Sequence, residues 1–424
     1  MTESAAQPSL SPFAGATASG SSAERFARGM AVLAQIGGAG FDLPLRKLAE
    51  VAPDLARFTV EFAYGDVLAR PGLALPLRQV VTVASLLAHG RAQRQLHYHM
   101  NGLLNAGATP ETLVELLYVA IVIVGFPIAV NAVALVREIF HERGVVFVPS
   151  APARGDGSER YAHGLAAMAA LLRTPAFDIA ALSALAPDFA QWSIEFEFGE
   201  ILARDVLPTP SRQLAIITML ATVGNRDEQL QRHLAGGLGS GLSVEEITEA
   251  LMQLAVYAGF PSALNALTLA LRVFANGPVP TQSQAPLLQP VSVVPSATHA
   301  ERMARGLATL ALTSGAAGAA VVASFDDLAP AIGRAIVEHA YGDIFARPTI
   351  DLRTRELAAC SAFAAVGNQA METPLRVHVN AALHTGASQQ EIIEVLLNLI
   401  PHCGYPSVEQ ALRIAAEEFA RFPP

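Results

Sequence analysis

The chain has 424 residues, of which 52% are hydrophobic and only 15% charged, and its formal net charge is −9. This composition excludes an intrinsically disordered protein, and the length allows several domains, each with its own core. Arginine and the single lysine, Lys47, form no basic cluster, so the sequence excludes a footprint for nucleic acid or an anionic membrane. The only cysteines, Cys360 and Cys403, indicate a reducing compartment, and we expect a cytoplasmic protein.

The first 23 residues are rich in Ser, Ala, Gly and Pro and lack both the basic and the apolar region of a signal peptide. They predict a disordered tail over 1–23. Further on, residues 116–135 are apolar enough to suggest a membrane span, but Gly125-Phe126-Pro127 interrupts them. Because the corresponding segments later in the chain carry polar residues, we expect a buried pair of helices and no membrane contact.

The rest of the chain is three diverged copies of one unit, which cover residues 24–143, 159–276 and 300–421. Their strongest common motif is Glu-Phe-Ala-Tyr-Gly-Asp at 61–66, which returns as Glu-Phe-Glu-Phe-Gly-Glu at 195–200 and Glu-His-Ala-Tyr-Gly-Asp at 338–343. The segments 144–158 and 277–299 are rich in Pro, Ser and Gly and have no apolar period, so they predict linkers. Internal repetition of this kind predicts tandem structural units.

Each copy predicts the same series of helices. It opens with Arg-x-x-x-Gly, and a proline stands eight residues before the glutamate of the common motif. An apolar helix led by arginine follows, then a helix that carries a histidine and ends at a glycine, and then Gly-Phe-Pro or Gly-Tyr-Pro. Capping boxes at 243–246 and 388–391, and Thr109-Pro110, mark helix starts. The only short β-like run is 145–148, so we predict an all-α fold.

Three histidines recur in one register, beside the apolar stripe of their helices. They are His99, His233 and His378. An inward-facing imidazole can transfer protons near neutrality when its environment tunes its pKa. A single histidine in such a place is more often a hydrogen-bonded core residue, but the threefold recurrence makes a catalytic role an even alternative.

Glutamates, tyrosines and arginines recur around the common motif. The glutamates are Glu61, Glu195 and Glu338, and the tyrosines are Tyr64 and Tyr341, with Phe198 in copy two. The arginines are Arg70, Arg204 and Arg347 and then Arg78, Arg212 and Arg355. The glutamates either pair with these arginines or act in catalysis, and the arginines are either structural partners or forks for a substrate carboxylate. We expect the motif to end in a turn at Tyr-Gly-Asp or Phe-Gly-Glu. A structural ion pair that holds this turn is at least as plausible for Asp66 with Arg70 and for Asp343 with Arg347.

Several cofactor sites are disfavoured by the spacing of the residues. His97 and His99 are two apart on a helix and point to different faces, and no phosphate-binding or dinucleotide motif follows a predicted strand. We therefore expect no metal and no other cofactor.

Taken together, the motifs resemble those of the γ-carboxymuconolactone decarboxylase family, over nearly the whole of each copy. The resemblance implies an alkyl hydroperoxidase D-like helical fold. It also implies a covalent pseudo-trimer, two of which would associate as a dimer of pseudo-trimers. The peroxidase branch of that fold needs a CxxC motif before the helix histidine. The three copies have no cysteine at these positions, which hold Ala92 and Gln95, Arg226 and Gln229, and Met371 and Pro374, so we expect no thiol peroxidase chemistry.

The resemblance further implies a cofactor-independent lyase that acts on a small carboxylated lactone or enolisable acid. In that chemistry arginines hold a carboxylate, tyrosine or histidine stabilises an enolate oxygen, and histidine or glutamate returns a proton. The residues of copies one and three fit these roles, with His99 as the proton donor of copy one, whereas Phe198 leaves copy two least complete. The alternative is a non-catalytic scaffold or regulatory protein on the same fold.

Overall fold

The computed structural model describes residues 21–90, 92–149, 158–172, 183, 185–275, 298–323, 325–327, 330–367, 371–400 and 405–421. All regular secondary structure in these ranges is helical, which confirms the all-α prediction, and residues 145–148 have no regular structure. Most of the predicted tail, most of both linkers, and His402 and Cys403 lie outside the described residues. None of the described helices is both long and apolar enough to cross a membrane.

The chain divides into two compact units, residues 1–71 and 72–424. The first unit holds α1 (Ser22–Gly37), α2 (Leu43–Val51), α3 (Pro53–Phe58) and η1 (Thr59–Leu68). Helix α1 begins inside the segment predicted as tail, because Ser21 and Glu24 form a capping box. The boundary between the units falls within copy one, since the apolar helix and the histidine helix of that copy belong to the second unit.

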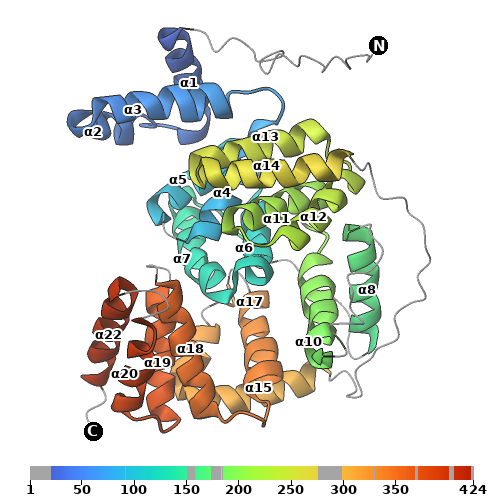
Figure 1. The fold of residues 1–424 in the computed structure, drawn as a ribbon, viewed down its shortest axis with the longest axis vertical. Helices are drawn as coiled ribbons and strands as arrows, with labels where there is room; N and C mark the ends of the chain where they lie inside the picture. Colours follow the sequence, from blue (N-terminus) through green and yellow to red (C-terminus); the bar gives the residue numbers. More distant parts are fainter. Residues whose placement is uncertain are drawn as a thin grey trace, which may run out of the picture. The chain divides into compact units, whose positions relative to one another are not determined.

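The second unit contains the remaining helices (Figure 1). From copy one they are α4 (Leu75–His89), α5 (Gln93–Asn105), α6 (Pro110–Val124) and α7 (Phe126–Arg143). From copy two they are α8 (Ser158–Leu172), α10 (Pro187–Trp192), η2 (Ser193–Leu202), α11 (Thr209–Val223), α12 (Asp227–Gly239), α13 (Val244–Tyr257) and α14 (Phe260–Ala275). From copy three they are α15 (His299–Thr313), α16 (Gly315–Ala323), α17 (Pro330–Ala335), η3 (Ile336–Phe345), α18 (Leu352–Val366), α19 (Glu372–His384), α20 (Gln389–Leu397) and α22 (Tyr405–Phe419).

The common motif forms a π-helix in every copy, where a turn after the tyrosine was predicted. Elements η1, η2 and η3 each have ten residues and continue directly from the short helices α3, α10 and α17. The wide turn is visible where the backbone N–H of Ala69 donates to the carbonyl of Tyr64, and that of Ala346 to Tyr341, both at 2.9 Å. Long π-helices are rare and concentrate at functional sites.

Each π-helix packs at very short range against the first helix of its copy, and two glycines make this approach possible. In copy three, a Cβ at Gly306 would overlap the carbonyl oxygen of Val337, and a Cβ at Gly342 would overlap that of Arg302. Gly164 meets the carbonyl of Ile194 in the same way. The recurring Arg-x-x-x-Gly of the sequence is thus explained by a backbone contact that tolerates no side chain.

The predicted helix ends are confirmed. Ser243 and Ser388 form capping boxes with Glu246 and Glu391, and Pro110 stands in the first turn of α6. Helix α6 ends before Gly125 and α7 begins at the next residue. Gly90, Gly107, Gly241 and Gly386 all have positive φ, as the helix ends there require.

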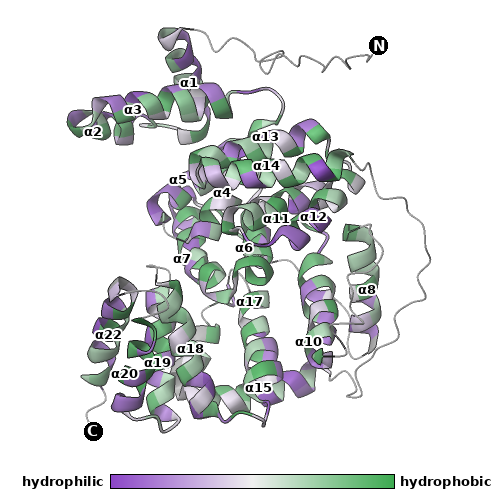
Figure 2. Cartoon of the chain, in the orientation of Figure 1, coloured by the Kyte–Doolittle hydropathy of each residue, from purple (hydrophilic) through white to green (hydrophobic). Residues whose placement is uncertain are grey.

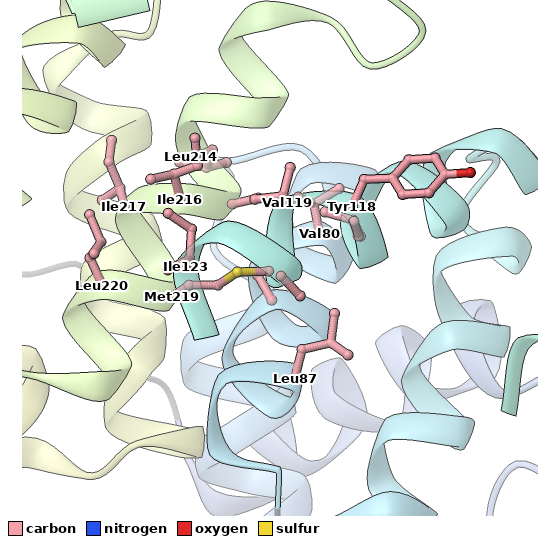
Figure 3. Close-up of a cluster of buried hydrophobic side chains, with 14 of the residues drawn as sticks. Val80, Leu87, Tyr118, Val119, Ile123, Leu214, Ile216, Ile217, Met219 and Leu220 are labelled. Atoms are coloured by element: carbon pink, nitrogen blue, oxygen red, sulfur yellow. The ribbon is translucent and has the colours of Figure 1, made fainter. Parts of the chain in front are cut away.

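Copies one and two share one hydrophobic core within the second unit, in which α4 packs against α11. Figure 3 shows Val80 and Leu87 from α4, Val119 and Ile123 from α6, and Leu214 and Met219 from α11 in this cluster. Hydropathy colouring shows α6 and α11 largely in the green of hydrophobic residues (Figure 2). Ser85 and Thr222 join the two central helices by a hydrogen bond of 2.9 Å between their hydroxyls.

Helices α18, α19, α20 and α22 of copy three have a separate core, built around Cys360, Val379, Ile392 and Ala415. Ile332 and Ala335 of α17 belong instead to the core of copies one and two. Its π-helix meets that of copy two, where His339 stacks on Phe196 with ring centroids 4.0 Å apart. These two residues occupy the same position of the common motif, so the two π-helices meet through equivalent surfaces.

Replacing Gly306 by alanine tests the backbone contact in copy three. We expect Gly306→Ala to lower the free energy of unfolding by about 2–3 kcal/mol, because Val337 cannot move without displacing η3. Ala308→Ser, which adds one atom at an exposed position of the same helix, should change it by less than about 0.5 kcal/mol. Urea titrations of both variants measure the difference, and equal stabilities would contradict the contact.

Candidate active site

The three glutamates of the common motif are buried, with 2–3% exposure, and each pairs with the arginine that opens its copy. Arg25 lies 3.3 Å from Glu61, Arg160 lies 3.2 Å from Glu195, and Arg302 lies 3.0 Å from Glu338. The acid at the end of the motif joins each pair, as Nε of Arg302 donates to Asp343 at 3.0–3.1 Å. The partner of the glutamate is thus the arginine that opens the copy. The sequence showed that this arginine recurs in every copy, but not that it pairs with the glutamate.

The same charges connect copies two and three. Nη1 of Arg302 donates to Glu200 of copy two at 2.9 Å as well as to Glu338. His299 lies 2.7 Å from Glu338. Glu200, His299 and Glu338 therefore bring imidazole and carboxylate ligand atoms close together. The guanidinium of Arg302 already neutralises the carboxylates there, which favours a structural ion-pair network at this place over a cation site.

Arg78, predicted to bind substrate, is fully buried and contacts copy two. Its Nη2 donates to Oε2 of Glu249 at 2.8 Å, and its Nη1 donates to Gln253 at 3.3 Å. Arg204 of copy two contacts copy one in turn. Its guanidinium binds Glu115 of copy one at 2.8–2.9 Å and stacks over the ring of Tyr118. Two buried ion pairs therefore hold copies one and two together.

The other predicted arginines lie in three different settings. Arg212 and Arg355 donate to carbonyls of the loop before their helix, among them Leu207 and Ile350 at 2.9 and 3.0 Å. Arg347 pairs with Asp188 of copy two rather than with Asp343, and it lies over the ring of Trp192. Arg70 belongs to the first unit together with Glu61 and Tyr64, whereas His99 belongs to the second.

Each of the three histidines has the same kind of partner, namely the residue that follows the arginine of the apolar helix. Nδ1 of His99 lies 3.0 Å from Oε1 of Gln79, and Nδ1 of His233 lies 2.8 Å from Oε1 of Gln213. In copy three the partner is a carboxylate, because Nδ1 of His378 lies 2.6 Å from Oε2 of Glu356. The amide of copies one and two is thus replaced by a charged acceptor in copy three.

Burial lowers the pKa of His99 and of His233 to about 3. Both imidazoles are therefore neutral at physiological pH, and an uncharged amide partner supplies no opposite charge to stabilise the protonated form. His99 is further enclosed by Tyr257 of copy two, whose hydroxyl lies 3.5 Å from its Nε2. These features are typical of hydrogen-bonded core histidines.

The pair in copy three has a different character. Glu356 is fully buried, and its Oε1 has no hydrogen-bond partner among the described residues. A buried carboxylate orients an imidazole and stabilises its protonated form, as in hydrolase triads. Phe345 and Phe363 border the ring of His378, with centroids 6.1 and 5.0 Å away. We call Glu356 and His378 the copy-three dyad.

Tyr341 lies between this dyad and a cavity. Its ring contacts Phe345 at 5.3 Å, and burial, together with the charge of Glu356, raises its pKa to about 12. It also lines a cavity of about 210 Å³ whose wall is mostly apolar and includes Leu310, Val322 and Asn380. Tyr341 therefore keeps its proton at neutral pH, and its hydroxyl, which has Ser314 and Thr313 as hydrogen-bond partners, is a potential donor at the cavity. His378 is on the same helix as Asn380 but is not part of the cavity wall.

Copy two has a larger hollow, of about 690 Å³, beside Arg204, Arg212 and the exposed His163. The predicted residues Glu195 and His233 do not line it. Phe198 stands where copies one and three have tyrosine, so this copy has no equivalent of the Tyr341 hydroxyl.

The structure thus brings Tyr341, His378 and the unpredicted Glu356 into one region of copy three. Glu338 lies instead in the ion-pair network with Arg302. One signal in the sequence could have found Glu356 and its equivalents. Each follows the repeated arginine directly and stands 20 or 22 residues before its histidine.

Comparison with known proteins gives a family for this architecture. The carboxymuconolactone decarboxylase family matches three times, at residues 53–138, 187–272 and 330–417, which together make up more than half of the chain. The chain belongs to this family, in three tandem copies.

Two relatives illustrate the range of the family. The 4-carboxymuconolactone decarboxylase of Acinetobacter baylyi is 32% identical over 123 residues, which is 29% of this chain and 91% of the relative. An uncharacterized 15.0 kDa protein of Paracoccus denitrificans is 33% identical over 97 residues, 23% of this chain and 72% of the relative. Both relatives thus match about one copy of the chain.

The role of Arg78 can be tested through its partner. Glu249→Gln removes the charge that compensates a fully buried guanidinium, so we expect a loss of about 3 kcal/mol in the free energy of unfolding. Glu245→Gln, an exposed position on the same helix, is the control and should stay within about 0.5 kcal/mol of the parent. If Glu249→Gln is as stable as the control, the pair does not hold copies one and two together.

The buried histidines predict a pH dependence. The pKa of His233 is about 3 in the folded protein, whereas an unfolded histidine has a pKa of about 6.5. Between these two pH values unfolding therefore takes up a proton. Stability should be full above pH 6.5 and fall towards pH 3, by up to roughly 1.4 kcal/mol per pH unit for each histidine.

Melting temperatures measured from pH 7 to pH 5 in parent and His233→Gln test this dependence. The variant should show a shallower decline, and the exposed His163→Gln should follow the parent. Parallel curves for all three proteins would contradict a neutral buried His233.

Proposed function

We propose that the protein is a cofactor-independent decarboxylase whose chemistry takes place in copy three. The observation that supports this most directly is the hydrogen bond of 2.6 Å between Nδ1 of His378 and the buried carboxylate of Glu356. Copies one and two hold their recurring histidines neutral against amides, so of the three recurring histidines only His378 has a carboxylate as its hydrogen-bond partner.

The dyad supplies and retrieves a proton. Glu356 fixes the ring of His378 with Nδ1 as the donor, which leaves Nε2 as the atom that exchanges a proton with substrate. When Nε2 is protonated, the carboxylate stabilises the resulting imidazolium. His378 is then a general acid for a carbanion or an enolate, and solvent restores its proton.

The cavity beside Tyr341 fits a small substrate. Its volume of about 210 Å³ lies below the roughly 300–1,000 Å³ of pockets for drug-sized ligands. The neutral hydroxyl of Tyr341 can donate to an enolate oxygen, and the apolar wall favours loss of a carboxylate, whose charge it solvates poorly. Arg376 also lines the cavity, where it is paired with Glu417 and Glu418. Arg347 and Arg355 stay predictions as carboxylate ligands.

The name of the Acinetobacter relative suggests the class of substrate. For a carboxylated lactone, the bond between the ring and its carboxylate breaks, carbon dioxide leaves, and the electron pair moves through a C=C bond to the lactone carbonyl. The resulting dienolate accepts a hydrogen bond from Tyr341 and then a proton on carbon, which His378 delivers through one water molecule because it does not line the cavity itself. A related enolisable acid would follow the same steps.

Copies one and two act as a scaffold in this proposal. Their histidines are hydrogen-bonded within a continuous core, and Arg78 and Arg204 are occupied by ion pairs between the copies. In the alternative, a wholly non-catalytic protein, the copy-three dyad would take part in no reaction.

Replacement of Glu356 tests the assignment. Glu356→Gln recreates the amide of copies one and two, and we expect it to lower kcat for decarboxylation of 4-carboxymuconolactone or a related lactone acid about 10²- to 10⁴-fold. His378→Gln should cost as much, and the double variant little more, because the two residues act as a unit. Carbon dioxide release measures the rate.

His384→Gln is the matched control, since His384 is an exposed histidine on the same helix as His378. It should retain the parental rate. Turnover that survives in Glu356→Gln and His378→Gln would overturn the assignment to copy three, and no turnover of any lactone or enolisable acid by the parent would favour the scaffold.

A further inference from the structure

Helices α5 and α7 of copy one bring three potential metal ligands together, outside the site in copy three. The residues are His97 of α5 and Glu138 and Glu142 of α7, and one ligand atom of each lies within 4.8 Å of the other two. The two glutamates are one helical turn apart, so their carboxylates share one face of α7, and α5 packs against that helix (Figure 1). The sequence disfavoured a metal because His97 and His99 point to different faces of α5. The structure shows that the partners of His97 come from α7 instead.

The imidazole of His97 is placed as a ligand and not as a hydrogen-bond donor. Its Nε2 lies 3.5 Å from Oε2 of Glu142, is buried, and has no hydrogen-bond partner among the described residues. This distance is longer than an ordinary N–H···O hydrogen bond. Two atoms bound to one tetrahedral zinc ion at 2.0–2.1 Å are about 3.4 Å apart. The two side chains are therefore spaced as two ligands of one ion.

The two glutamates lack a compensating arginine or lysine in the part of the chain that the structure describes. The arginines beside them on α7 are bound elsewhere. Arg137 pairs with Asp327 of copy three, and Arg143 donates to Asn101 and Asn105. Like charges one turn apart destabilise a helix, and a divalent cation between the carboxylates would offset that cost.

Copy three supplies a cation from the protein at the equivalent positions. Arg376 stands at the place of His97 and Glu417 at the place of Glu138, and these two residues form an ion pair. Arg421 stands at the place of the second glutamate. Copy three thus has two guanidinium groups and one carboxylate where copy one has an imidazole and two carboxylates. A metal ion in copy one would take the place of the charge that arginine provides in copy three.

We propose that copy one binds a zinc ion between α5 and α7. The ligands are Nε2 of His97 and one carboxylate oxygen each of Glu138 and Glu142, with water in the fourth position. A set that includes an imidazole nitrogen favours zinc over magnesium and calcium, which take oxygen ligands. The ion joins the two helices, so its role is structural, and the proposal does not depend on the proposed activity of copy three.

Calorimetric titration of the untagged full chain with zinc chloride, after removal of metal with EDTA, tests this site. We expect one zinc ion per chain, and Co²⁺ added in its place should show the intense visible bands of four-coordinate geometry. His97→Gln and Glu142→Gln should each raise the dissociation constant for zinc about tenfold or more, because even the loss of an outer partner of a metal ligand costs about 10- to 100-fold. His141→Gln and Glu245→Gln, at exposed positions outside the cluster, are the matched controls and should bind zinc as the parent does.

His97→Arg separates loss of the site from loss of the fold, since it recreates in copy one the ion pair of Arg376 with Glu417. This variant should bind no zinc, and without metal it should melt no lower than the parent. A parent that binds no zinc would overturn the proposal. So would zinc binding that survives unchanged in both His97→Gln and Glu142→Gln, because the ion would then lie elsewhere.

Discussion

The structure depends on the contact between the first helix of each copy and its π-helix. Two glycines let the backbones approach until a Cβ would overlap a carbonyl, and an arginine from the first helix then reaches the glutamate and the acid of the motif. Burying these carboxylates is acceptable only because a guanidinium pairs with them, and in copies two and three that guanidinium is buried as well. The same network in copy three extends to Glu200, so the element that defines a copy also connects copies two and three.

One position, equivalent in the three copies, carries an amide in two of them and a carboxylate in the third. At the position after the repeated arginine, Gln79 and Gln213 hold their histidines as neutral core residues, whereas Glu356 provides a carboxylate. All three residues stand directly after the repeated arginine and reach the histidine of their own copy. Copies one and two are joined by an extensive core and buried ion pairs, and copy three keeps a cavity beside Tyr341. Stability and chemistry are thereby divided between copies in the proposal.

The sequence predicted the three copies, the all-α fold and the helix ends, because glycine, proline and capping residues act locally. It did not predict the π-helices, since a wide turn is fixed by packing and not by propensity. It also gave the glutamates the wrong candidate partners. Arg302 reaches Glu338 across 36 residues, a separation that periodicity within one helix cannot reveal. Glu356 was missed because a charge at the start of an apolar helix is usually exposed.

The most direct measurement is a crystal structure of the protein soaked with a non-reactive analogue of a lactone carboxylate. Our account predicts that the analogue lies in the copy-three cavity, with its carbonyl oxygen within hydrogen-bond distance of the Tyr341 hydroxyl. Binding that persists in Glu356→Gln would show that the dyad serves chemistry and not affinity. An analogue found only beside Arg204 and Arg212 of copy two, with the copy-three cavity filled by side chains, would contradict the account.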